Sequence, residues 1–319
     1  MLNEIFEIII ENKEWLFSGI GNSISSKFLN SKKKTIDSYT NVVNYNINLK
    51  GTDRLKSVND VKGDIDNQMS DLVDRFISIY GGHGILVSQI PFFVSDNFNF
   101  RLSSFKDKNS ILNLLDEKIM NWTCNVFGVE RAWLDGSTNR IYKYMNYYKR
   151  INKFIEAIFE LKSLYGNELD AIFIKSGELN PNKYGENYVI VIIRYPIKKI
   201  NGNTIYKHIP ISTNWDWGYW RSRYQLKFII YICRKLNIYI EGYDSSLDTI
   251  YKISGGLVFP SVEINEQKLG CTWYPEDYVS YLYNNQCAKE IDEIDIVRKY
   301  FEDEGYIKYF NIIREKFKI

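Results

Sequence analysis

The eight residues from Tyr188 to Tyr195 form an almost uninterrupted apolar run, Tyr-Val-Ile-Val-Ile-Ile-Arg-Tyr. A strand with one solvent-exposed face alternates apolar and polar residues, whereas a strand buried on both faces is apolar at nearly every position. The run is also rich in β-branched residues, which favour extended structure. It therefore predicts the central strand of a sheet, and the rest of the chain must supply the cover for that sheet.

The segments around this run predict an α+β fold. Helical spacing is found at 151–164, 224–236 and 245–254, and strands are expected at 169–175, 204–211 and 238–241. Asn201-Gly202-Asn203 is a hairpin signal between two of the strands. The order α-β-β-β-α-β-α predicts a mainly antiparallel sheet. An irregular stretch at 257–277 and helices at 278–289 and 292–317, the latter broken at Gly305, are expected to follow.

Residues 1–150 have a different character and suggest three further parts. Residues 1–34 read as an amphipathic helix at 3–20 with a basic tail, and residues 35–66 as a polar linker. We expect the helix to pack on its own protein or on a second copy, giving a homo-oligomer, rather than on a membrane. Residues 67–150 are expected to form a helical bundle and residues 151–319 the α+β domain.

The bundle is predicted from a series of helix starts and stops. A helix at 67–80 stops at Gly81-Gly82, a short helix or turn contains Pro91, and a helix at 108–127 is capped by Gly128. A last short helix at 130–134 ends the series, and its surroundings contain Val129, Trp133, Leu134 and Gly136.

This arrangement over residues 71–136, about a fifth of the chain, resembles the helix-turn-helix domains of phage repressors (XRE type). The resemblance implies docking to duplex DNA, in which a recognition helix presents polar side chains to base edges. The recognition helix should lie near residues 91–104. The sequence there is Pro91-Phe92-Phe93-Val94 followed by a polar loop. We therefore expect a bundle with a degraded recognition helix that docks DNA or a protein. The nearby cations are Arg101, Lys106 and Lys108.

An unusual concentration of aromatic and charged residues precedes the helix at 224–236. Its members are Trp215, Asp216, Trp217, Trp220, Arg221 and Arg223. At a helix N-terminus they could bind a nucleotide or another anion through amide donors and stacking. They could equally cover the edge of the sheet. A second such stretch, 137–150, interleaves tyrosines with cations, which suits base stacking or, as we favour, the joining of two domains.

The order α-β-β-β-α-β is also similar to the core of restriction-endonuclease-like nucleases. That chemistry needs carboxylates to hold a metal and a lysine to help activate water. The resemblance implies Asp170, Lys175 and Glu186 as the catalytic set and magnesium as the cofactor. The central strand lacks an acid-x-Lys pair, so a metal-dependent nuclease, or an inactive derivative, is the alternative interpretation.

Composition argues against several classes of protein function. A net charge of +2 argues against a protein that coats nucleic acid, and four scattered cysteines with two histidines argue against structural zinc. No signal peptide or run of about 18 apolar residues is found. We expect a cytoplasmic, bacterial-type regulatory or sensing protein without catalytic activity or a cofactor. Its bundle would dock DNA or a protein, and its α+β domain would bind a ligand or partner.

Overall fold

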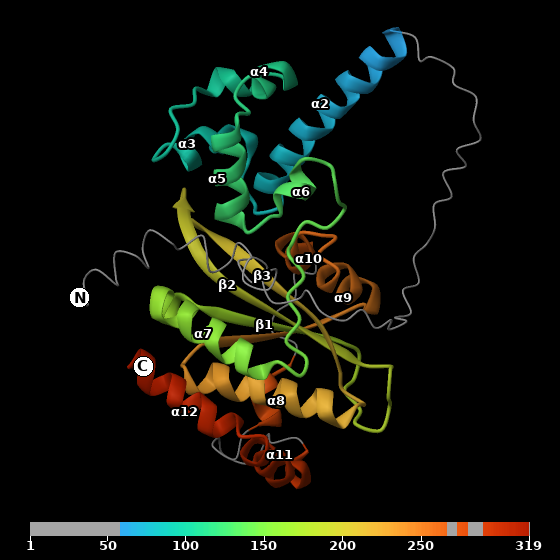
Figure 1. Cartoon of the computed structure of the whole chain (residues 1–319), viewed down its shortest axis with the longest axis vertical. Helices are drawn as coiled ribbons and strands as arrows, with labels where there is room; N and C mark the ends of the chain where they lie inside the picture. The colour runs from blue at the N-terminus through green and yellow to red at the C-terminus, as the bar shows by residue number, and fades with distance from the viewer. Residues whose placement is uncertain (1–57, 267–272, 280–289, 319) are drawn as a thin grey trace, which may run out of the picture. The chain divides into compact units, whose positions relative to one another are not determined.

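The computed structural model describes residues 58–266, 273–279 and 290–318 (Figure 1). Met69–Ile319 form one compact unit and Met1–Gln68 another. The predicted helix at 3–20 lies outside the described residues, as does most of the predicted linker. Helix α2, Val58–Gly81, already begins inside the end of that linker.

The sheet has four strands in the order β3-β2-β1-β4. Their bounds are β1 Asp170–Ser176, β2 Tyr188–Ile200, β3 Asn203–Asp216 and β4 Tyr239–Ser245. β2 pairs antiparallel with β1 and with β3, and β4 lies parallel to β1. The α+β class is confirmed, with two of the three pairings antiparallel. The apolar run of 188–195 lies in β2, an inner strand, as its composition predicts.

Helices cover both faces of the sheet, which explains why its inner strands are apolar at successive positions. Figure 1 shows α7, Ile151–Tyr165, and α8, Trp220–Lys235, on one side, and α9, Leu247–Ser254, on the other. Alternate side chains of β1 and β2 pack on α9 in one core: Ile172, Ile174, Ile190 and Ile192, with Ile250 and Ile253 from the helix.

The bundle consists of short helices packed around α2. They are the 3₁₀ helices η2 Val87–Gln89 and η3 Leu102–Phe105, and the α-helices α3 Ile90–Val94, α4 Lys108–Leu112, α5 Glu117–Phe127 and α6 Arg131–Leu134. The single helix predicted at 108–127 is wrong. The Asp116 carboxylate accepts a hydrogen bond of 2.8 Å from the amide of Ile119, which starts a new helix. Gly128, in the left-handed conformation at φ +73°, ends α5 as predicted.

The β2–β3 hairpin reaches from the sheet into the core of the bundle. Its turn is made by Asn201 and Gly202, at φ +49° and +84°, as the hairpin signal predicts. Ile200 and Ile205 beside the turn are buried in the same cluster as the bundle core. Lys198 adds an ion pair of 2.8 Å to Asp96. Bundle and sheet therefore share apolar packing within the unit Met69–Ile319.

The C-terminal segments complete the cover of the α7–α8 face. Helices α11, Ile291–Asp303, and α12, Tyr306–Phe317, meet at Gly305 as predicted. The 3₁₀ helix η4, Gly166–Glu168, joins α7 to β1. The prediction of irregular structure throughout 257–277 is wrong, because it contains α10, Pro260–Glu266, and the 3₁₀ helix η5, Pro275–Tyr278. Among the helices that the structure describes, none is long and apolar enough to cross a membrane.

Candidate ligand-binding site

The parallel strands β1 and β4 end side by side in the sheet. In the register of β1 and β4, Lys175 lies opposite Asp244 and Ser176 opposite Ser245. From here the chain leaves β1 toward β2, while it leaves β4 toward α9 on the face of the sheet. A crevice outside the carboxyl ends of parallel strands, where the connections diverge, is a common place for ligands in α/β sheets.

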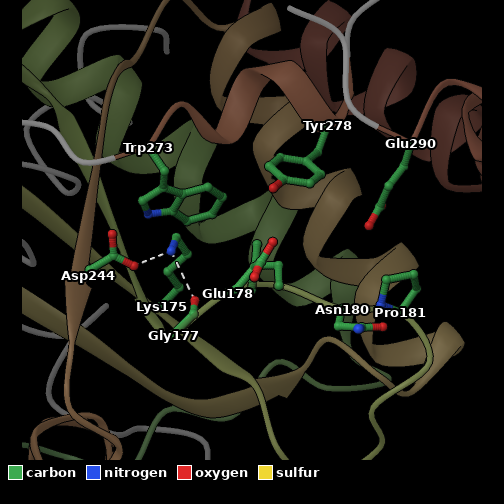
Figure 2. Close-up of a pocket in the computed structure, with 10 residues that line it drawn as sticks. Lys175, Gly177, Glu178, Asn180, Pro181, Asp244, Trp273, Tyr278 and Glu290 are labelled. Carbon is green, nitrogen blue, oxygen red and sulfur yellow. Dashed lines mark hydrogen bonds and ion pairs between the residues drawn. The ribbon is translucent and has the colours of Figure 1, made fainter.

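A cavity of about 700 Å³ lies at this place. Figure 2 shows its labelled side chains converging from the ends of β1 and β4, the loop after β1 and the segments before α11. The lining residues are Lys175, Gly177, Glu178, Leu179, Asn180, Pro181, Asp244, Trp273, Tyr278 and Glu290. The volume lies in the range of small-molecule sites.

Lys175 and Asp244 form an ion pair on the floor of the cavity. The Lys175 side chain is only 13% exposed, and its Nζ also donates a hydrogen bond of 2.9 Å to the carbonyl oxygen of Gly177. Asp244 is 40% exposed, so one of its faces remains open to the cavity. The pair fixes the direction of both side chains without removing the carboxylate from solvent.

The opposite wall is aromatic and lies near several carboxylates. Burial raises the pKa of the Tyr278 phenol to about 12, with further contributions from Glu290, Asp277, Glu178 and Asp244. The indole of Trp273 donates to the backbone carbonyl oxygens of β1 and β4, which holds its ring across the strand ends. Figure 2 shows the two rings above the carboxylate of Glu178. Three lining carboxylates therefore stand against the single lining ammonium of Lys175.

Glu290 is held from behind by buried groups of the sheet and α8. It accepts a hydrogen bond of 3.1 Å from the indole Nε1 of Trp217 and another of 2.6 Å from Lys227, whose side chain is fully buried. Lys227 also contacts Glu293 at 2.6 Å. Burial opposes the ionisation of Glu293, but hydrogen bonds from Arg223 and the charge of Lys227 lower its pKa to about 2. This ionised network gives the cavity wall a fixed geometry.

The residues predicted from the 215–223 stretch are divided between the interior and the surface. Trp215 and Trp217 are completely buried and Arg223 is nearly so. Trp215 and Asp216 end β3 rather than enter a helix. The Asp216 carboxylate accepts from the amides of Gly185 at 3.0 Å and Gly218 at 2.9 Å. Trp217 and Arg223 thus support the cavity from behind and do not line it.

The other two residues of that prediction, Trp220 and Arg221, lie in the first turn of α8. Trp220 is 44% exposed, and the Arg221 guanidinium lies over its ring at 5.1 Å. The cavity residues Asp244, Trp273, Tyr278 and Glu290 were not predicted. Their proximity depends on the pairing of β4 with β1, which no local pattern in the sequence specifies.

The alternative catalytic set is spread over the sheet. Asp170 and Lys175 lie at opposite ends of β1, five residues and therefore roughly 17 Å apart. Asp170 is paired with Arg194 at 3.1 Å, and Glu186 with Lys183 at 3.2 Å. Over the described ranges, no group of three or more His, Cys, Asp or Glu is arranged to hold a metal ion.

The predicted DNA-binding cations do not lie on a projecting helix. Arg101 precedes η3 in an extended conformation, and Lys106 follows it. Lys108 starts α4, but its ammonium is bound to Asp74 at 2.5 Å and to Ser70 at 2.8 Å on α2. The helix at the place of the recognition helix, α3, is only five residues long.

Comparison of the chain with models of protein families, with curated proteins and with solved structures finds no match. The assignment of a function therefore depends on the geometry of the chain itself.

Proposed function

We propose that the protein is a non-enzymatic regulatory protein that binds a small organic cation in the cavity at the ends of β1 and β4. Its helical bundle docks a protein partner. The observation that carries the proposal is the cavity of about 700 Å³, with carboxylates and two aromatic rings on its walls.

The chemistry of the lining favours a cation over an anion. Asp244 is paired with Lys175 and Glu290 with Lys227, which leaves Glu178 as the lining carboxylate for which the described residues provide no ion pair. Aromatic faces attract cations through the ring quadrupole by about 0.5–2 kcal/mol, and carboxylates add charge-assisted hydrogen bonds. A diamine or quaternary ammonium compound matches this combination of charge and apolar surface.

Docking by the bundle is supported by apolar side chains that its surface leaves uncovered. Leu86, Phe92 and Leu102 are 66%, 56% and 60% exposed. Large exposed apolar side chains gathered on one part of a protein favour a protein partner, whereas Lys108 is engaged with α2. Sedimentation of the protein and of a Phe92→Ser, Leu102→Ser variant tests whether that partner is a second copy, because self-association through this surface is lost in the variant.

Calorimetric titration with putrescine and with choline, next to adenosine monophosphate as an anionic probe, tests the ligand site. We expect one of the two cations to bind, and saturation at 100 times the dissociation constant to stabilise the fold by about 2.7 kcal/mol. Glu178→Gln removes one carboxylate from the cavity and weakens binding about tenfold. Glu168→Gln, an exposed glutamate at the other end of β1, is the matched control.

Two results would overturn the assignment. One is that neither cation binds while the nucleotide does. The other is that the Glu178 and Glu168 variants bind a cation equally well, because the charge of the cavity would then be irrelevant to binding.

A further inference from the structure

A row of aromatic rings covers the surface at the start of α8, outside the cavity. Tyr184 packs edge-on against Tyr219, with ring centroids 5.9 Å apart, and Tyr219 lies 6.3 Å from Trp220. Burial raises the pKa of the Tyr148 phenol to about 12, with a further contribution from Tyr219 beside it, so Tyr148 adds another ring to the row. Tyr184 and Trp220 are 74% and 44% exposed, so these rings offer free faces to solvent. We call this set, Tyr148, Tyr184, Tyr219 and Trp220, the aromatic row.

The row joins three stretches that are far apart in the sequence: the segment before α7, the loop after β1 and the start of α8. The segment before α7 runs along β3 and reaches α8: the amide of Tyr147 donates to Thr213 on β3 at 3.0 Å, and the amide of Lys149 donates to Gln225 on α8 at 2.9 Å. Tyr148 thereby comes within 6.2 Å of Trp215, ring centre to ring centre. The tyrosine-rich segment thus packs along the sheet and also leaves rings at the surface.

Cations lie beside the aromatic row. Lys149 and Arg150 beside Tyr148 are exposed, and Lys149 lies 5.3 Å from the Tyr148 ring. Arg221 stacks on Trp220, and its Nε is buried without a hydrogen-bond acceptor among the described residues.

We infer that the aromatic row with Lys149, Arg150 and Arg221 binds single-stranded nucleic acid. Exposed rings in series accept successive unpaired bases, and flanking cations follow the phosphates. The sixteen-residue helix α8 begins here, and its free amide groups add positive potential. Paired bases do not expose their faces, so a duplex gains only the charge contacts. This surface is separate from the cation-binding cavity, and its test does not depend on that proposal.

Fluorescence anisotropy of 5′-labelled dT20 and rU20 with the full chain, over a series of salt concentrations, tests the inference. We expect binding to the single strands that weakens with salt, and weaker binding to a duplex of equal length. Tyr184→Ala and Trp220→Ala each weaken single-strand binding about tenfold. Arg221→Gln lowers the slope of log affinity against log salt by about 0.7, the value of one phosphate contact on a single strand.

The matched controls are Tyr239→Ala, an exposed tyrosine at the far end of β4, and Lys199→Gln, an exposed lysine in the hairpin. Neither should change the affinity. Tyr184 is so exposed that its variant should keep the fold even where Trp220→Ala loses it, and thermal unfolding checks both.

Absence of binding at low salt overturns the inference. A second contrary outcome is binding that heparin abolishes and that Tyr184→Ala and Trp220→Ala leave unchanged. That result would mean that the surface binds polyanions through charge alone, without base stacking.

Discussion

Two buried histidines at the contact between bundle and sheet should make the fold sensitive to mild acid. His83 follows α2 and His208 lies on β3, with their rings 6.0 Å apart and each 6% exposed. Nδ1 of His83 donates a hydrogen bond of 2.6 Å to the carbonyl oxygen of Ile79, and its ring packs at a tilt against Phe127 with ring centroids 4.4 Å apart. Nδ1 of His208 has no partner among the described residues. Neither ring has a carboxylate that would stabilise its protonated form in these contacts.

Burial lowers the pKa of His83 to about 4, with a smaller effect from the charge of Lys207. Burial also lowers the pKa of His208, and His83 and Arg194 oppose its protonation further. The unfolded chain protonates His83 near pH 6.5, so below that pH it binds a proton that the folded chain does not accept until about pH 4. Stability therefore falls as the pH falls through this window. For His83 alone the loss between pH 7 and pH 5 is about 2 kcal/mol.

Urea unfolding at pH 7, 6 and 5, followed by tryptophan fluorescence, measures this loss. His83→Asn keeps a donor near the Ile79 carbonyl oxygen but cannot be protonated. The variant is less stable at every pH because it packs poorly, yet its loss between pH 7 and pH 5 should be about 2 kcal/mol smaller than that of the wild type. His208→Asn should flatten the dependence in the same direction. Equal losses in wild type and His83→Asn would refute the reasoning, because the acid sensitivity would then come from other groups.

Three further substitutions test the packing behind the cavity and the turn of the β2–β3 hairpin. In Gly242→Ala the new methyl group would overlap the carbonyl oxygen of Trp273, so we expect unfolding free energy to fall by about 1–3 kcal/mol and cation binding in calorimetry to be lost. Lys227→Met leaves Glu290 and Glu293 short of a cation and should cost about 3–5 kcal/mol in urea unfolding, whereas Lys235→Met at the exposed end of the same helix should be nearly neutral. Asn201→Ala puts alanine at a positive φ in the hairpin turn and should cost about 1 kcal/mol; a neutral result would show that the turn adopts another form.

The elements of the α+β part were predictable because each carries a local signal. The apolar run in 188–195, the Asn-Gly turn and the glycine at 305 act within a few residues, and the structure has a strand, a turn and a helix break at these places. The break in 108–127 was missed because the apolar spacing continues across Asn113–Asp116. A side-chain cap from Asp116 overrides that spacing.

The candidate cavity was not predictable in the same way because its residues are brought together by strand order. Nothing near Asp244 shows that β4 lies beside β1 rather than at the free edge of β3, and only the first arrangement puts Asp244 next to Lys175. The same limitation applies to Glu290, which reaches the cavity from a segment more than forty residues after β4. Long-range pairing of this kind is set by the packing of the whole unit.

The stretch 215–223 illustrates how one sequence signal serves two surfaces. Trp217 and Arg223 point to the network behind the cavity, whereas Trp220 and Arg221 belong to the aromatic row. Gly218 between them has no room for a side chain, because a methyl group there would overlap the backbone of Lys183. Close packing at Gly218 therefore fixes the backbone of the segment. A variant that removes only the exposed ring of Trp220 should leave the cation affinity of the cavity unchanged. We expect Trp220→Ala to lower nucleic-acid affinity at the aromatic row without changing cation affinity at the cavity. Loss of both affinities would mean that Trp220 also stabilises the fold of the segment.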